Sequence, residues 1–437
     1  MSASELVALV CCDLGSIVRG RSLPASELGD WLGSGVGWVP ANHSLTPLGS
    51  LAEESPFGST GDLRLLPDVE TRVRVGGEEA AAAMQLLLCD IVETDGRPWA
   101  CCPRHFLREA LRELREEFGL RVVSSFEHEF QLLRDEPPPL PFSLEAQRRA
   151  EPFASRAMAA LSEAGAEPER FFPEFAPHQY EVPVAAAEGL AGADRGVVVR
   201  EVVRELARRH GLRATFVPML DPAGPGNGVH VHIALLDPAG KPALYEAGRP
   251  AHLSELGMSF AAGILAHAGA LSALTAPSPV SAPRLRPHHW SAGAVCLGER
   301  NREALLRIPP LVELGASEPA GQLRLEYRGA DAAANPYLAL GAIVRAGLEG
   351  MRAGLRPPPI LDRDPGELGE QDRERFGVGA LPASLADALR ALADDETVRG
   401  WMDPQLYDAY VGIKRAELHA AEQLELGEVC RRYAAIY

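Results

Sequence analysis

The first hundred residues alternate short apolar runs with turn residues, which is the pattern of a small β-sheet. Residues 5–12 (ELVALVCC) form an apolar run that stops at a tight Asp-Leu-Gly-Ser turn. Two more strand-like pieces occupy 72–75 and 84–92, and Asp95-Gly96 after them is typical of a hairpin turn. The pattern predicts a small β-rich domain over residues 1–100.

From residue 101 the apolar spacing becomes helical. The run 104–118 places leucines three and four residues apart and is followed by Gly119, a typical C-cap. Strand-like segments alternate with further predicted helices at 146–164 and 196–210, and residues 385–437 are mostly helical by periodicity. We therefore expect an α+β fold, with a larger second domain over 101–437.

Charge and cysteine content narrow the classes of function. The 437 residues carry a formal net charge of −17, which argues against a nucleic acid as partner. The seven cysteines form no CxxC motif, so neither a zinc site nor a disulfide framework is expected. The apolar run 6–12 is too short for a signal sequence, and no window approaches a membrane span. These features predict a cytoplasmic protein.

The segment 126–131 (FEHEFQ) is the first one that contains candidate functional residues. Side chains alternate along a strand, so Glu127, Glu129 and Gln131 share one face. Two carboxylates side by side repel each other unless a cation lies between them. A solvated strand face explains the pair as well as a divalent metal does, so the metal requires further ligands elsewhere in the chain.

Other segments supply such groups. Two glutamates lie among aromatic residues and prolines at 172–181, and His230 and His232 share a strand face after a glycine-rich turn. In 324–328, two arginines and a glutamate alternate on one face. A surface loop, a structural histidine pair and a salt-bridge ladder are the simpler explanations. Metal and phosphate binding explains all of them together.

Six motifs, in this order, resemble those of the glutamine synthetase family. They are FEHEF (126–130), EFAPHQYE (174–181), GNGVHVH (226–232), SAPRLRP (281–287), NREALLRIP (301–309) and RLEYRGADAAANPY (324–337). The resemblance implies an N-terminal β-grasp domain over 1–100 and a catalytic domain over 101–437 with an antiparallel sheet and flanking helices. It also implies a homo-oligomer of two stacked hexameric rings, with active sites between adjacent subunits.

The resemblance further implies ATP as a substrate and two divalent ions, Mg²⁺ or Mn²⁺. One ion would be held by Glu129, Glu174 and Glu181, and the other by Glu127, His230 and Glu326. In this chemistry a glutamate-like acid attacks the γ-phosphate of ATP, and an amine then displaces phosphate from the acyl phosphate. Phosphoryl transfer depends mainly on positioning and charge neutralisation, so arginines are expected near the metals.

The remaining matches imply roles for arginines and neighbouring residues. Catalytic roles fall to Arg302 and Arg328, and Arg302 and Arg307 would face the transferred phosphoryl group. The acid would contact Glu129, Gly226, His230, Arg284 and Arg328, and the nucleotide would contact His232, Arg307 and Arg324.

Three departures from the family pattern concern the substrates. Trp290 occupies the place of a flexible glutamate that helps to bind ammonium, and no aspartate lies between Asp30 and Asp62 to supply its partner. A large aromatic residue suits an organic amine, such as a polyamine or ethanolamine. Pro225 and His178 replace an asparagine and a glycine of the family pattern, so these departures leave open whether the acid substrate is glutamate or an analogue. Glutamine synthesis from ammonia, a non-catalytic structural or regulatory relative and a guanidino kinase are the alternative functions.

Overall fold

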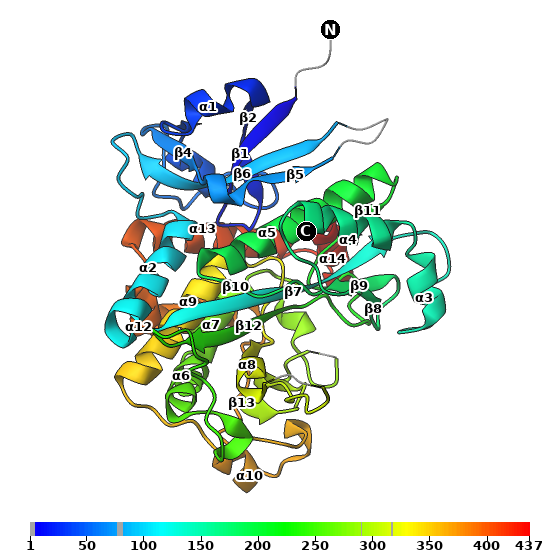
Figure 1. The fold of residues 1–437 in the computed structure, drawn as a ribbon, viewed down its shortest axis with the longest axis vertical. Helices are drawn as coiled ribbons and strands as arrows, with labels where there is room; N and C mark the ends of the chain where they lie inside the picture. Colours follow the sequence, from blue (N-terminus) through cyan, green and yellow to red (C-terminus); the bar gives the residue numbers. More distant parts are fainter. Residues whose placement is uncertain (1–4, 77–81, 290, 316–317) are drawn as a thin grey trace.

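Two β-sheets organise the chain in the computed structural model, which describes residues 5–76, 82–289, 291–315 and 318–437 (Figure 1). The smaller sheet lies at the N-terminal end, and the larger one crosses the middle of the molecule with helices packed around it. The protein is therefore a mixed α+β structure with an N-terminal β domain.

The N-terminal sheet has the strand order β2-β1-β6-β4-β3, with β5 paired to β6. Its central strands β1 and β6 pair in parallel, and β1 pairs antiparallel with β2. Each strand predicted from the apolar pattern is present. The strands are β1 Leu6–Cys12, β2 Val18–Pro24, β3 Val36–Trp38, β4 Leu63–Pro67, β5 Val73–Val75 and β6 Met84–Glu93.

The larger sheet has the order β13-β14-β15-β12-β7-β9-β8, with β10 and β11 also paired to β7. Strands β7, β12 and β15 pair antiparallel, whereas β13 and β14 pair in parallel, so the sheet is mixed. The strands are β7 Arg121–Leu133, β8 Phe172–Pro173, β9 Gln179–Val182, β10 Ala187–Glu188, β11 Arg213–Thr215, β12 Val229–Leu236, β13 Ala294–Glu299, β14 Ala304–Ile308 and β15 Leu325–Tyr327.

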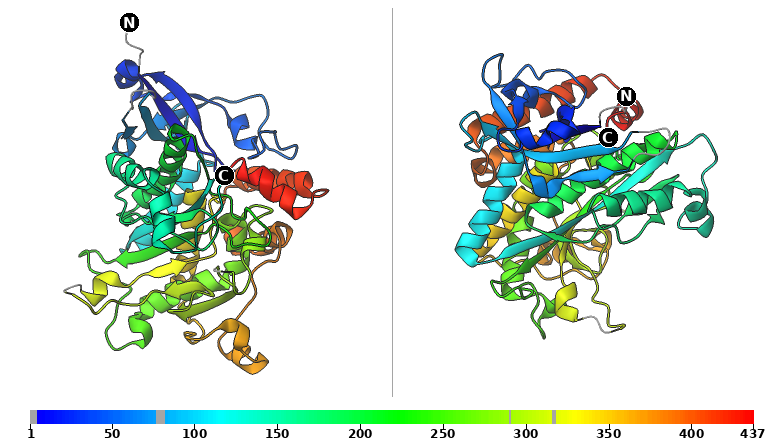
Figure 2. Two further views of the ribbon diagram at one scale, coloured as in Figure 1. Left: turned by 90° about the vertical axis from the view of Figure 1, so that its right-hand side faces the viewer. Right: turned by 45° about the horizontal axis from the view of Figure 1, so that its top comes forward.

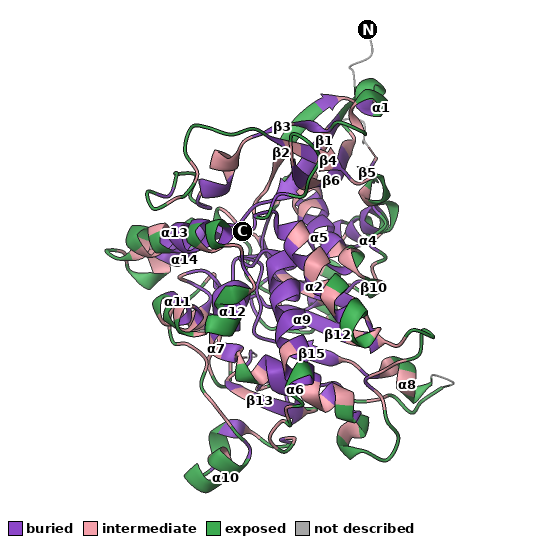
Figure 3. Cartoon of the chain, turned by 90° about the vertical axis from the view of Figure 1, so that its left-hand side faces the viewer, coloured by how far each residue is buried: buried purple, intermediate pink, exposed green. Residues whose placement is uncertain are grey.

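Helices cover this sheet and form most of the core. Helix α5 packs on β7, and α9 packs against α2 and α6 and is buried along most of its length (Figure 3). The main helices are α2 Pro103–Phe118, α4 Phe153–Glu163, α5 Leu190–Arg209, α6 Glu255–Ala266, α7 Ala268–Thr275, α9 Pro336–Arg352, α11 Leu385–Asp394, α13 Pro404–Ala421 and α14 Leu426–Ala434. Shorter helices are α1 Leu28–Trp31, α3 Leu144–Arg149, α8 Pro319–Gln322, α10 Glu370–Arg375 and α12 Glu396–Gly400.

Two helix predictions need correction. The segment 146–164 is not one helix, because Pro152 has no N–H to continue the ladder and separates α3 from α4. Helix α5 begins at Leu190, ahead of the predicted start at Gly196. Glycines in its first turns hide the apolar period, yet they let the helix approach β7, since a Cβ on Gly192 would overlap the hydroxyl of Ser124.

The C-terminal helices return to the N-terminal domain. Helix α13 contacts the short helix Pro40–Ser44, and α13 and α14 lie beside the N-terminal sheet in Figure 2. The Tyr437 hydroxyl donates to the Gly15 carbonyl (2.7 Å) in the β1–β2 turn. None of the described helices is by itself long and apolar enough to cross a membrane; α6 and α7 meet that test only jointly, as a pair bent by 75°.

Candidate active site

A cavity of about 410 Å³ opens on one face of the larger sheet. Its wall contains eleven of the residues singled out from the sequence: Glu127, Glu129, Glu174, Glu181, His230, His232, Arg302, Arg307, Arg324, Glu326 and Arg328. These residues come from five separate segments of the chain. The polar faces predicted for the individual strands therefore meet at one place.

Strand register explains the convergence. His230 on β12 lies opposite Glu127 on β7, and Glu181 on β9 lies opposite Glu129. On the other side of β12, Glu326 lies opposite His232. Residues directly opposite in paired strands point to the same face. One alternating pattern in each strand is thus enough to build a continuous polar surface.

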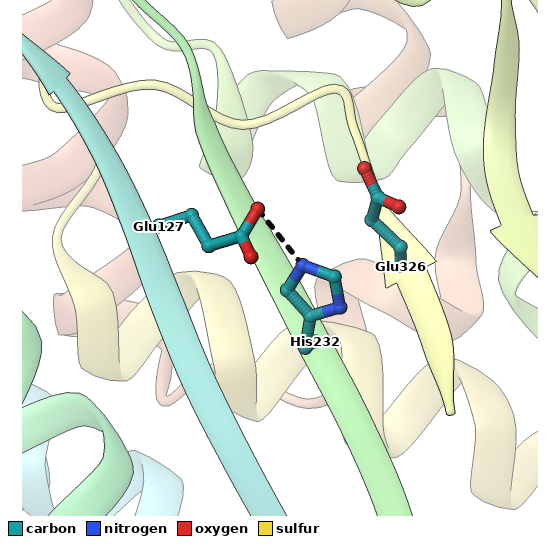
Figure 4. A group of neighbouring side chains, drawn as sticks. All are labelled: Glu127, His232 and Glu326. Atoms are coloured by element: carbon teal, nitrogen blue, oxygen red, sulfur yellow. Dashed lines mark ion pairs between the residues drawn. The ribbon is translucent and has the colours of Figure 1, made fainter. Parts of the chain in front are cut away.

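Glu127 lies between two histidines. Its Oε2 is 3.0 Å from His232 Nε2 (Figure 4). The same oxygen is 3.7 Å from His230 Nδ1. Arg324 Nε donates to His232 Nδ1 (3.0 Å), so Nε2 is the ring nitrogen that faces the carboxylate. Burial would raise the pKa of Glu127, but His232 and His230 hold that pKa well below its ordinary value.

Glu326 is buried between two arginines. Arg307 Nη1 donates to its Oε2 at 2.5 Å, and Arg328 Nη1 donates to its Oε1. Burial alone would raise the pKa of Glu326, but Arg328, the two histidines and Arg307 lower it to about 2. The carboxylate is therefore ionised at any physiological pH.

The pKa values of Glu174 and Glu181 are shifted in the opposite direction, upwards. Burial and the neighbouring Glu129 raise the pKa of Glu174 to about 7. Burial, Glu127 and Glu129 raise the pKa of Glu181 well above its ordinary value. Like charges crowded together favour protonated carboxyls, and a cation among them would reverse that preference.

Arg284 and Gly226 lie at the Glu129 end of the cavity. A Cβ on Gly228 would be 3.1 Å from Arg284 Nη1 and 3.5 Å from Glu129 Oε2, so the two side chains approach each other there. Gly228 N donates to Glu129 Oε2 (2.7 Å). Trp290, expected at the amine site, lies outside the described residues.

Comparison with known protein families identifies both parts of the chain. Residues 1–99 match the glutamine synthetase N-terminal domain, and residues 100–429 match the glutamine synthetase catalytic domain. The chain belongs to the glutamine synthetase family. It is accordingly a ligase that forms C–N bonds.

Individual relatives cover nearly the whole chain. The γ-glutamylpolyamine synthetase GlnA3 of Streptomyces coelicolor is 32% identical over 98% of this chain and 92% of its own. The glutamine synthetase of Pyrococcus furiosus is 31% identical over 94% of this chain and 88% of its own. A solved structure described as a novel glutamine synthase homologue superposes with a TM-score of 0.92, at 48% identity, over 100% of this chain and 99% of that one. Ligand-free GmaS superposes with a TM-score of 0.82, at 27% identity, over 98% and 96%.

The glutamine synthetase family typically uses ATP and divalent metals, and the donors present here fit a divalent cation. Glu127, Glu181 and His230 place ligand atoms within 4.8 Å of one another, as do Glu127, His232 and Glu326. The buried Nε2 atom of His230 has no hydrogen-bond partner among the described residues. Carboxylates and imidazoles are ordinary ligands of such ions. His232 thus joins the possible ligands, although the motifs placed it with the nucleotide.

Some residues of this glutamine synthetase cavity were missed from the sequence. Phe142, Arg170, Phe172, Pro183 and Pro309 also line it. Phe142 follows a proline-rich loop and has a φ of 56°, so the backbone directs an exposed aromatic ring to the cavity. A phenylalanine directly after PPPLP is the one signal in the sequence, and it is too common to indicate a site.

Proposed function

We propose that this chain joins glutamate, or a close analogue, to an organic amine at the cost of ATP, through a γ-glutamyl phosphate. The coarser activity, ATP-dependent ligation of a carboxylate and an amine or ammonia, follows from the family. The choice of an organic amine over ammonia is the proposal.

The observation that carries this choice is that the loop after Arg284, residues 285–293, contains no aspartate or glutamate. Residues 285–293 read LRPHHWSAG, and no aspartate lies between Asp30 and Asp62. Ammonium binding requires fixed negative charge, because NH₄⁺ is strongly hydrated and offers no apolar surface. An aromatic residue such as Trp290 instead offers contact and cation–π attraction to the carbon chain of a protonated amine. The printed name of the GlnA3 relative, a γ-glutamylpolyamine synthetase, supports the same choice.

The residues of the cavity suit the expected chemistry. We assign Arg302 and Arg307 to the oxygens of the transferred phosphoryl group, and Arg284 and Arg328 to the acid. Bound Mg²⁺ or Mn²⁺ would neutralise phosphate charge, held by Glu127, Glu129, Glu174, Glu181, His230 and Glu326, with His232 adjacent. A carboxylate oxygen of the acid bonds to the γ-phosphorus while ADP leaves. The amine, after losing its ammonium proton, then bonds through nitrogen to the acyl carbon, phosphate leaves, and the nitrogen releases a further proton to give the amide.

Phosphate release tests this proposal. The enzyme with ATP, Mg²⁺ and glutamate is given ammonium, ethanolamine, putrescine or spermidine, each at low millimolar concentration. We expect an organic amine to give the highest rate, with a γ-glutamyl amide detected by mass spectrometry. The proposal fails if ammonium exceeds every organic amine, and a phosphorylated amine without amide would indicate a kinase.

A substitution that introduces a carboxylate into the loop tests the role of Trp290. Trp290→Glu is expected to raise the rate with ammonium relative to the best organic amine at least tenfold. His289→Glu adds the same charge one residue earlier in the loop and serves as the control. An equal shift in both variants would assign the effect to charge alone.

We also propose a ring assembly of two hexamers, as is usual in the family, with active sites between subunits. Exposed large apolar side chains support an interface, since Leu140, Leu144 and Leu314 are 74%, 71% and 85% exposed. Mass photometry of the purified protein should show twelve copies of the chain. A stable monomer with full activity would contradict shared active sites.

A further inference from the structure

Two buried amide side chains continue the polar face of the cavity beyond its carboxylates. Glu129 on β7 lies opposite Glu181 on β9, and two positions along the same pair of strands Gln131 lies opposite Gln179. Side chains two residues apart on a strand share a face, so the amides extend the surface that the carboxylates begin. Only 4% of Gln131 and 3% of Gln179 is exposed, so their polar atoms need partners within the protein.

Gln179 makes hydrogen bonds in two directions. Its Nε2 donates to the Gly226 carbonyl (2.9 Å) and to Asn227 Oδ1 (2.8 Å). Its Oε1 accepts the Ala176 amide (2.8 Å). The carbonyl requires a donor and the amide requires an acceptor, so these contacts fix which way the side chain faces. Gln179 therefore ties the segment before β9 to the glycine loop, residues 224–228, before β12.

Asn227 is the second member of this network, and only 1% of it is exposed. Its Nδ2 donates to the Val217 carbonyl (2.8 Å) and to Gln131 Oε1 (3.3 Å), and its backbone N–H donates to the Pro218 carbonyl (2.9 Å). Because Nδ2 serves two acceptors, Oδ1 is the atom that faces Gln179. The amide cannot turn over without placing its oxygen against the Val217 carbonyl, so the network has one arrangement.

The glycine loop borders the place assigned to the acid. Gly228 N donates to Glu129 Oε2 (2.7 Å). A Cβ on Gly226 would lie 2.6 Å from Arg284 Cγ, so the loop backbone touches the aliphatic stem of the arginine assigned to the acid. Glycine has more accessible backbone conformations than other residues, so the loop depends on bonds from outside it for a single position. Gln179 supplies such a bond at Gly226.

We propose that Gln179, acting through the Gly226 carbonyl and Asn227, is a positioning residue for the acid substrate. It fixes the glycine loop relative to the segment that carries Glu181, so that the loop and Arg284 meet the acid in one arrangement. This inference rests on the proposed function, which assigns Arg284 to the acid.

The consequence is selective for one substrate. Without the Gln179 donor, two buried acceptors, the Gly226 carbonyl and Asn227 Oδ1, lose the N–H groups that they share, and the loop shifts to find other partners. The acid then binds to a less ordered site, at a cost in affinity. His232 and Arg324, assigned to the nucleotide, are bonded to each other (3.0 Å), so ATP binding should change little.

The test measures steady-state kinetics of the complete enzyme with glutamate, ATP, Mg²⁺ and hydroxylamine as amine probe. Gln179→Met keeps the length of the side chain and removes all three hydrogen bonds, whereas Gln179→Glu keeps the acceptor for Ala176 and removes only the donors. Both variants are expected to raise the KM for glutamate at least tenfold, and Gln179→Glu should change the KM for ATP less than twofold.

Gln85→Met is the matched control. Gln85 is also a buried glutamine, 5% exposed, and its Nε2 donates to Glu5 (2.8 Å) in the N-terminal domain. Its substitution removes a buried amide away from the cavity, so the KM for glutamate should stay within twofold of the wild-type value.

The two variants separate positioning from other causes. A higher glutamate KM in Gln179→Glu alone would assign the effect to repulsion between carboxylates, and a higher KM in Gln179→Met alone would assign it to the Ala176 contact. Either result would overturn the inference, as would an unchanged glutamate KM in both variants. All three outcomes leave the proposed function intact.

A double-mutant cycle adds a test of the network itself. Asn227→Ala should also raise the KM for glutamate, and its combination with Gln179→Met, or with Gln179→Glu if the methionine variant does not fold, should give less than the product of the two single effects. The full product would show that the residues act separately and would contradict the inference. An unchanged glutamate KM in Arg284→Ala would instead overturn the assignment of the acid site, and the inference with it.

Discussion

At the scale of single residues, two carboxylates on the same cavity have different surroundings. Glu127 faces two histidines and is part of both groups of metal-competent ligands, whereas Glu326 is clamped by Arg307 and Arg328. The charge of Glu127 is balanced by histidines, which a bound cation can replace. Glu326 belongs to one of these groups of ligands and is in addition held in an ion pair by two arginines.

This difference predicts unequal effects of removing each charge. Glu127→Gln and Glu326→Gln should each lower turnover at least 100-fold. Only Glu326→Gln should also destabilise the fold, by about 3 kcal/mol, because it leaves two buried arginines without their shared carboxylate. Turnover and urea unfolding are measured in parallel, with the exposed Glu188→Gln as control. Equal stability of the two cavity variants would show that the Glu326 clamp adds little.

Gly226 gives a second test at this scale. A methyl group there would overlap the Pro218 carbonyl and press on the Arg284 stem. We expect Gly226→Ala to raise the KM for glutamate at least tenfold through displacement of Arg284. Gly400→Ala is the control, because a Cβ at Gly400 meets nothing within 4 Å. A wild-type KM for glutamate in Gly226→Ala would show that the stem does not need this space.

The residue pattern predicted which side chains belong to the site better than it predicted which of them contact each other. Alternation along single strands placed Glu127 with Glu129 and His230 with His232, since each pattern is local. Which side chains touch depends on register between strands far apart in the sequence. The 3.0 Å approach of His232 to Glu127 and the double clamp on Glu326 were therefore not foreseeable. Their roles toward metal and nucleotide stay predictions.

At the scale of elements, close helix packing relies on glycines. Helix α6 crosses α9 where Gly263 faces Ala346 and Gly350, and a Cβ on Gly263 would overlap the Ala346 carbonyl. A glycine, Gly192, likewise lets α5 pack closely on β7. Glycine is unfavourable inside a helix, so its presence in the sequence indicates a break instead of a tight contact. This is why the start of α5 was missed, whereas the leucine-rich α2 was predicted closely.

The α6–α9 contact predicts a stability effect without a direct effect on the site. Gly263→Ala should destabilise the protein by about 3 kcal/mol, since the two helix backbones must separate to admit a methyl group. Urea unfolding measures this change, and KM values for ATP and glutamate in the folded variant should remain at wild-type levels. A neutral or stabilising effect, as expected from helix propensity alone, would contradict the close packing.

At the scale of the whole molecule, buried neutral histidines link folding to pH. Burial, with a contribution from Arg19, lowers the pKa of His43 to about 3, and burial, with Arg200, lowers the pKa of His128 to about 3. In the unfolded chain both pKa values are about 6.5. Between pH 6.5 and 3 the unfolded state therefore binds protons that the folded state does not, and stability falls as pH falls.

The size of this linkage is measurable. From pH 7.5 to 5.0 each histidine should cost about 2 kcal/mol of stability, at about 1.4 kcal/mol per pH unit below 6.5. His128→Gln should remove its share, so its stability loss over that interval is smaller by about 2 kcal/mol. His419→Gln, at an exposed position, should lose as much as the wild type. Parallel losses in the wild type and His128→Gln would refute the linkage.

Competition between amines tests the central claim most directly. The enzyme is given ATP, Mg²⁺, glutamate and equal concentrations of ammonium and an organic amine, with putrescine, spermidine and ethanolamine tried in turn, and the products are separated by mass spectrometry. The account predicts that, for at least one of these amines, the γ-glutamyl amide exceeds glutamine at least tenfold. Glutamine as the main product against every amine would show that the loop around Trp290 does not select an organic acceptor.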